Sequence, residues 1–192
     1  PALQRPFEFG TDVVIHSMTK FLNGHADVVG GVIVTKNKEM YTHFRKTLNQ
    51  IGGVIDPFNS FLCHRGLKTL ALRMERCSEN AQKIAEYLAS NSKVKSVRFP
   101  GLVTDPSHAI ASKQMHHFGF IISFDLGDQQ SADKFLGRSQ LIFEATSFGG
   151  IHSMAERRAR WGTDNVSPGL IRLSVGCEKL EDLMADITQA LE

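Results

Sequence analysis

The chain has 192 residues, of which 42% are hydrophobic and 22% charged, and these values are typical of a globular protein with one or two domains. Its net charge of +2 at pH 7 is too small to indicate binding to nucleic acid or to an anionic membrane surface. No apolar run reaches the ~18 residues that a membrane-spanning helix needs.

The first 60 residues predict two strands followed by a helix. Residues 11–16 form a short β-branched apolar run, which indicates a buried strand, and residues 32–34 indicate a second one. A helix is expected over residues 38–50. Asp56 followed by Pro57 predicts a turn or the start of a further helix.

Residues 61–92 predict one long amphipathic helix. Apolar side chains recur there at steps of three and four, with Arg and Glu residues on the other faces. We interpret the apolar stripe as core rather than as a binding site. Its members are Leu67, Leu70, Met74, Cys77, Ala81, Ile84 and Leu88.

Residues 93–192 predict a compact α+β unit. Apolar runs indicate strands, and stretches with helical spacing or a capping residue such as Ser131 indicate helices between them. The expected strands are residues 94–99, 118–126, 141–143 and 170–175, and the expected helices are residues 107–115, 131–137 and 180–191.

Two details of the last unit bear on function. Alternation in the strand at residues 170–175 places Ile171, Leu173 and Val175 on one face and Arg172 and Ser174 on the other. The locally basic run at residues 156–161 could suit nucleic acid, but at this net charge we interpret it as a solvated loop or helix face.

Cysteine and histidine usage predicts no metal site. The three cysteines form no C-x-x-C pair, and the eight histidines show no metal-ligand spacing. Three unpaired cysteines suit reduced thiols, which favours a cytoplasmic protein.

The residues most suited to chemistry lie where the first predicted strand ends. Ser17 and Thr19 offer hydroxyl donors to phosphate oxygens, and Lys20 offers an amine that can form an imine with an aldehyde. Ends of strands in α/β domains are common ligand sites. On spacing alone this signal is weak, because most lysines are solvated surface charges.

A longer match gives the lysine a role. Residues 16–31 resemble the cofactor-attachment signature of the Cys/Met-metabolism family of pyridoxal-phosphate (PLP) enzymes, which includes cystathionine γ-synthase, cystathionine γ- and β-lyase and methionine γ-lyase. The resemblance continues through residues 65–70, 99–102 and 169–176 and covers essentially the whole chain.

The resemblance implies an α/β fold of the fold type I PLP-dependent transferase class. Residues 1–60 would be the C-terminal part of the large PLP-binding domain, residues 61–92 a long linking helix, and residues 93–192 the small C-terminal α+β domain. The implied cofactor is pyridoxal 5'-phosphate, and the implied substrate is a small sulfur amino acid.

The resemblance also implies roles for individual residues. Lys20 would form the Schiff base and act as the catalytic general base, while Ser17 and Thr19 would hold the cofactor phosphate. Arg172 would bind the substrate α-carboxylate, as a guanidinium can with two parallel hydrogen bonds. Ser147 would lie close to Lys20 and that carboxylate. From the residues alone, Arg172 could equally be a structural arginine paired with Glu178 or Glu181.

One position departs from the family pattern. Many γ-acting relatives have a glutamate immediately before the serine of the S-x-G-G segment, where it meets the distal part of the substrate, and this chain has Thr146 there. We therefore expect a carbon–sulfur lyase acting on cystathionine or a related amino acid, by β- or γ-elimination. A γ-replacement synthase is the alternative.

The resemblance reaches only the C-terminal half of a family-length protein. We expect the N-terminal half of the same enzyme, which would hold further cofactor contacts, to be a partner in the working enzyme. A homotetramer is implied by the family. Without the other half, the chain would be a non-catalytic fragment.

Overall fold

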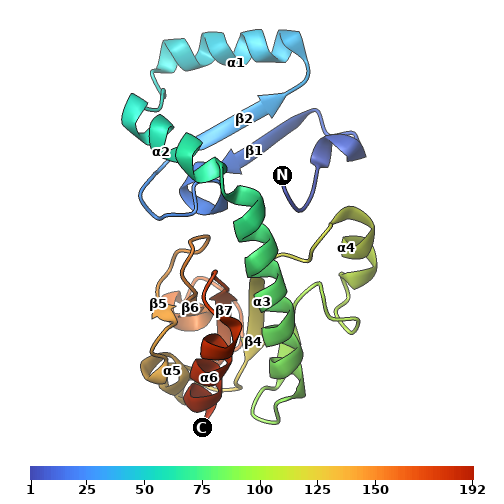
Figure 1. The fold of residues 1–192 in the computed structure, drawn as a ribbon, viewed down its shortest axis with the longest axis vertical. Helices are drawn as coiled ribbons and strands as arrows, with labels where there is room; N and C mark the ends of the chain where they lie inside the picture. Colours follow the sequence, from blue (N-terminus) through green and yellow to red (C-terminus); the bar gives the residue numbers. More distant parts are fainter.

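The computed structural model describes all 192 residues, which form two units joined by a long helix (Figure 1). The first unit contains strands β1 (Val13–Ser17) and β2 (Gly31–Thr35) and helices α1 (Lys38–Ile51) and α2 (Pro57–Leu67). The strands pair antiparallel, with Ile15 opposite Ile33. The expected strands and helix are therefore present, but the expected burial of the first strand is wrong, because only Val14 of β1 is buried and Ile15 is exposed.

Both helices of this unit begin at side-chain caps. Asn37 accepts a hydrogen bond from the backbone N–H of Met40 at the start of α1. Asp56 accepts from Phe58 and Asn59 at the start of α2, so the helix start predicted at Asp56 is confirmed.

The joining helix is α3 (Leu70–Ser90). The single helix predicted over residues 61–92 is wrong at its start, because α2 ends at Leu67 and Thr69 has non-helical backbone angles. Leu67 is exposed rather than part of the core. From Leu70 onward, the predicted apolar stripe is buried, and it packs on the second unit.

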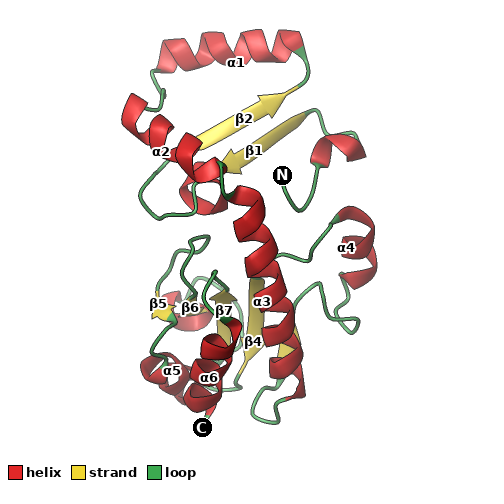
Figure 2. Cartoon of the chain, viewed as in Figure 1, coloured by secondary structure: helices red, strands yellow, loops and turns green.

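The second unit is a five-stranded sheet in the order β3-β4-β7-β6-β5. Helices α3, α5 and α6 lie along the sheet in Figure 1, and Figure 2 shows the contrast with the two-stranded first unit. The further elements are β3 (Ser96–Arg98), α4 (His108–Gln114), β4 (Ile121–Asp125), α5 (Gln129–Arg138), β5 (Phe143–Glu144), β6 (Met154–Arg157), β7 (Leu170–Ser174) and α6 (Leu180–Leu191).

The core of the chain lies under this sheet. Strands β4 and β7 contribute fully buried side chains, and α3 and α6 cover them. The predicted alternation in β7 is confirmed, because Ile171, Leu173 and Val175 are buried and Arg172 lies on the other face. None of the helices combines the length and the apolar character that crossing a membrane requires.

Two local predictions in this unit are wrong. Helix α5 begins at Gln129, and its N-cap is Asp128, whose side chain accepts from the backbone N–H of Ser131. The basic run at residues 156–161 is not a solvated face throughout, because Glu156 lies in β6 and is completely buried. The many charged residues of this run had suggested that it is exposed, whereas ion pairs make the burial of Glu156 possible.

Candidate active site

Strand β1 leads directly into the turn that carries Lys20. Residues Met18–Leu22 form a short helical turn, interrupted at Lys20, whose φ and ψ are −101° and −136°. The backbone N–H of Gly24 closes the turn by donating to the Lys20 carbonyl. Thr19 ties it to the next segment, because its hydroxyl accepts from the backbone N–H of Gly30 at 3.1 Å.

The structure brings Lys20 and Ser147 together from the two units. Lys20 Nζ donates to Ser147 Oγ at 2.9 Å, across 127 positions of sequence. Gly149 makes this approach possible, because its φ is +93° and a Cβ there would lie 2.9 Å from Lys20 Cβ. A larger residue would therefore push the lysine turn away.

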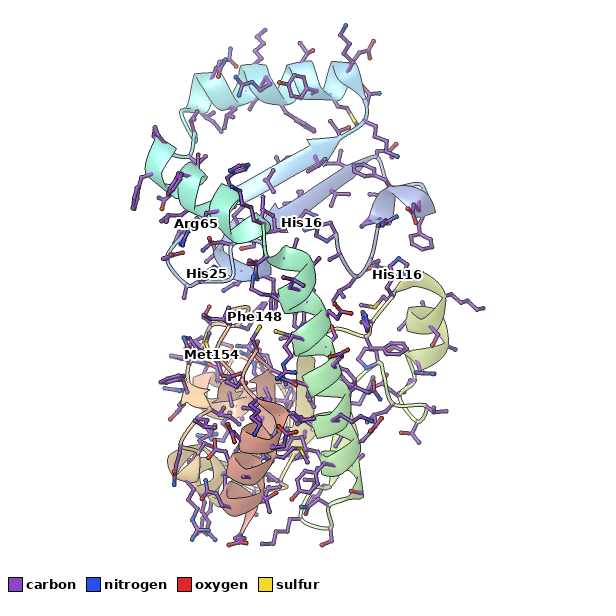
Figure 3. All side chains as sticks on the ribbon, in the orientation of Figure 1. His16, His25, Arg65, His116, Phe148 and Met154 are labelled. Carbon is purple, nitrogen blue, oxygen red and sulfur yellow. The ribbon has the colours of Figure 1, made fainter.

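Phe148 contacts both cationic side chains of the site. Its ring centroid is 4.7 Å from Lys20 Nζ and 5.0 Å from Arg172 Cζ. Figure 3 shows Phe148 beside α3, at the junction of the two units. A cleft next to Lys20 is lined by Ser17, Phe21 and Phe148 among other residues. The cleft thus presents an amine and a hydroxyl, and the Arg172 guanidinium lies over the Phe148 ring that lines it.

Arg172 is held by Glu156 and Thr146. Its Nη2 donates to Glu156 Oε2 at 3.0 Å and to the backbone carbonyl of Thr146. The alternative pairings expected from sequence are wrong, because Glu178 accepts from Ser153 and Glu181 is near Lys179. Thr146 therefore meets Arg172 through its backbone, a contact that sequence reasoning did not anticipate.

Electrostatics keep this pair ionised. Burial by itself raises the pKa of Glu156, but hydrogen bonds from Trp161 and Arg158 and the charge of Arg172 outweigh it, so the pKa lies below its usual value. Burial lowers the pKa of the Arg172 guanidinium, and the charge of Glu156 opposes that change. A guanidinium remains charged at neutral pH in either case.

Arg73 of α3 supports the lysine turn from behind, a role that sequence reasoning missed. It is buried and donates to the backbone carbonyls of Phe21, Leu22 and Gly66. The available signal was its position on the apolar side of α3, one helical turn before Cys77. A buried arginine normally marks a specific set of acceptors.

The donor set fits a phosphorylated aldehyde cofactor. Lys20 Nζ is hydrogen-bonded to a hydroxyl and forms no ion pair with a carboxylate. Ser17 is exposed two residues before Thr19 and lines the same cleft as Lys20. The Thr19 hydroxyl is engaged with Gly30, so Ser17 is the freer of the two predicted phosphate donors.

Comparison with known proteins agrees with this chemistry. The family model described as Cys/Met metabolism PLP-dependent enzyme matches residues 1–192. The chain belongs to this family. The resemblance noted in the sequence is confirmed, and with it the dependence of the family on PLP.

Relatives with different activities match the whole chain. It is 45% identical to the cystathionine beta-lyase of Lactococcus lactis subsp. cremoris, covering 53% of that protein. It is 43% identical to the cystathionine gamma-lyase of Bacillus subtilis, again covering 53%. A solved structure of cystathionine gamma synthase from Xanthomonas oryzae pv. oryzae superposes with a TM-score of 0.95 at 40% identity, covering 100% of this chain and 52% of that one.

The chain therefore spans about half the length of the relatives that it matches. The expected fold class is confirmed, because the whole chain follows a solved structure of a PLP enzyme of this family.

Proposed function

We propose that this chain carries the catalytic lysine of a PLP-dependent carbon–sulfur lyase that acts on cystathionine or a related sulfur amino acid. The hydrogen bond of 2.9 Å between Lys20 Nζ and Ser147 Oγ, with Lys20 and Arg172 both over the Phe148 ring, is the observation that supports it best. Family membership supports the same chemistry.

The proposed roles are those that the family resemblance implies, and the geometry of the side chains supports them. Lys20 holds the cofactor covalently in the resting enzyme, and Ser17, assisted by Thr19, binds its phosphate. Arg172 binds the substrate α-carboxylate and so fixes the orientation of the Cα–H bond. PLP, when bound, withdraws electrons from the substrate Cα.

Lys20 moves the proton in this mechanism. With PLP and substrate bound, Lys20 Nζ would remove the proton from the substrate Cα as a general base. Ser147 keeps Nζ on the side of the pocket that Arg172 faces. In β-elimination the Cβ–S bond then breaks, homocysteine leaves, and hydrolysis of the remainder gives pyruvate and ammonia.

The choice between β- and γ-elimination depends on the distal part of the substrate. Thr146 stands where many γ-acting relatives have a glutamate, and its backbone is used to hold Arg172. This supports a β-lyase without excluding γ-chemistry, because relatives with both names match the chain equally far.

We further propose that the remaining half of the enzyme lies in an upstream segment, that the enzyme is a cytoplasmic homotetramer, and that residues 93–192 form its small domain. Exposed apolar side chains on the first unit, such as Ile15 and Phe58, support the presence of a covering partner.

The test uses the intact enzyme with cystathionine as substrate. Pyruvate indicates β-elimination and 2-oxobutyrate γ-elimination, whereas formation of neither product contradicts the lyase. Borohydride reduction followed by peptide mass analysis should find the cofactor on Lys20. Lys20→Ala should lose both the label and the activity, while the matched control Lys46→Ala, on exposed α1, should keep both.

A further inference from the structure

Glu156 is a completely buried carboxylate with no role in the proposed chemistry so far. It lies in β6 directly opposite Arg172 of β7, and its side chain is 0% exposed. Burying a carboxylate is costly unless charged partners and hydrogen bonds surround it. Such a group is therefore expected to have a specific task.

Three donors converge on this carboxylate. Oε2 accepts from Arg172 Nη2 at 3.0 Å and from Arg158 Nη1 at 2.8 Å, and Oε1 accepts from Trp161 Nε1 at 2.7 Å. Arg158 is itself fixed by Asp164, to which it donates through Nε and Nη2. Glu156 is thus held by Arg158 and Trp161 as well as by Arg172.

The contact orients the guanidinium of Arg172. Nη2 is occupied by Glu156 and by the carbonyl of Thr146, whereas Nη1 and Nε have no partner within the chain. The Arg172 guanidinium lies over the Phe148 ring, which Lys20 Nζ also contacts. The unoccupied donors are therefore the ones available to a ligand beside Lys20.

We infer that Glu156 is the positioning residue that holds Arg172 for the α-carboxylate of the amino-acid substrate, and that Arg158 and Trp161 hold Glu156 in turn. This inference rests on the proposed function. Glu156 does not touch substrate or cofactor in it; it acts by fixing the guanidinium, which otherwise has several rotatable bonds.

The experiment compares carboxylate-dependent and carboxylate-independent binding in the intact enzyme. Glu156→Gln keeps the shape but removes the charge, so KM for cystathionine should rise about tenfold while kcat changes little. Affinity for an amine analogue that lacks the α-carboxylate should stay at the wild-type value. A purely structural role would instead weaken both ligands together or leave both unchanged.

The matched control is Asp133→Asn. Asp133 pairs at 2.7 Å with Arg157, the next residue of β6, and is half exposed. The Asp133→Asn variant loses an ion pair to the same strand but leaves the contacts of Arg172 unchanged, so its KM for cystathionine should remain at the wild-type value. A rise equal to that of Glu156→Gln would overturn the inference.

Two further variants keep the outcome decisive. If Glu156→Gln loses the bound cofactor, Trp161→Phe removes only one hydrogen bond to Glu156 from a half-exposed side chain. Trp161→Phe should raise KM for cystathionine by a smaller factor, and an unchanged KM would overturn the inference.

Arg172→Ala separates the two proposals. If it leaves KM unchanged, the proposed role of Arg172 fails; if it raises KM while Glu156→Gln does not, only the inference about Glu156 fails.

Discussion

Lys20 depends for its hydrogen bond on a residue 127 positions further along the chain. A family resemblance could suggest Ser147, but the residues near Lys20 could not, because the contact exists only after the two units meet. Glu156 was missed for a similar reason. Its neighbours in sequence are arginines, which suggested a solvated surface, whereas its burial depends on Arg172 in the neighbouring strand.

We expect Ser147→Ala to impair proton transfer more than cofactor attachment. A hydrogen bond of this kind contributes about 0.5–1.5 kcal/mol, so a loss of roughly two- to tenfold in kcat is expected. Steady-state kinetics of the intact enzyme measure kcat, and borohydride labelling of Lys20 should be retained. Ser90→Ala, which removes a hydroxyl at the far end of α3, is the control. Equal kcat values for the two variants would show that Ser147 does not position Lys20.

At the scale of elements, α3 is positioned against the lysine turn by Arg73 and by glycines that leave room for it. Gly24 has φ of +79°, and a Cβ there would lie 2.1 Å from Arg73 Nη1. Gly10 has nearly the same backbone, with φ of +82°, but a Cβ there would meet nothing within 4 Å. An alanine at either position would therefore have the same unfavourable backbone conformation, but only at Gly24 would its Cβ also clash with Arg73.

We expect Gly24→Ala to destabilise the enzyme clearly more than Gly10→Ala. An alanine in the left-handed region costs about 1–2 kcal/mol at either position, and forcing Arg73 away from its carbonyl acceptors adds about 1–3 kcal/mol at Gly24. Urea unfolding midpoints of the two variants provide the comparison. Equal shifts would mean that Arg73 can move without loss.

The contact between α3 and the end of β7 includes a thiol pair. Cys77 Sγ and Cys177 Sγ are 3.4 Å apart. The hydrogen bond with Cys77 lowers the pKa of Cys177 to about 7, and the charges of Arg73 and Arg76 act in the same direction. Cys63 serves as an internal reference, because it is buried and desolvation raises its pKa.

We expect Cys177 to be the cysteine that reacts fastest with iodoacetamide at neutral pH. Only the thiolate reacts, so the rate should rise as pH increases through about 7 and level off above it. Short labelling pulses at several pH values, read by peptide mass analysis, give the midpoint. In Cys77→Ala the midpoint should move to higher pH. An unchanged midpoint would show that the thiol pair does not stabilise the thiolate.

Elements with strong periodicity were predictable from sequence, and those defined by tertiary contacts were not. Helix α6 and strand β7 have apolar patterns that match their buried faces. Strand β6 has only four residues, two of them charged, so its pattern resembles a loop. The break between α2 and α3 was missed because the spacing of apolar residues continues across it, although Leu67 is exposed.

At the scale of the whole molecule, the two units differ in how completely they are covered. The buried core consists almost entirely of residues from α3 onward, with Leu22 as the contribution of the first unit. The first unit instead exposes large apolar side chains on its strands and helices. These include Ile15, Ile33, Val34, Tyr41, Phe58 and Phe61. Such a surface is normally covered by another part of the protein or by a partner.

This contrast predicts which segments fold alone. Helix α3 packs on β3 and β4, and its buried residues Ile84 and Leu88 belong to the core of the second unit. Residues 69–192 should therefore unfold cooperatively on heating, whereas residues 93–192, which lack α3, should bind a hydrophobic dye and melt without a clear transition. Circular dichroism and dye fluorescence of the two fragments measure this. A cooperative transition in residues 93–192 alone would support a small domain that begins after α3, as the sequence suggested, and would make α3 a linker rather than part of its core.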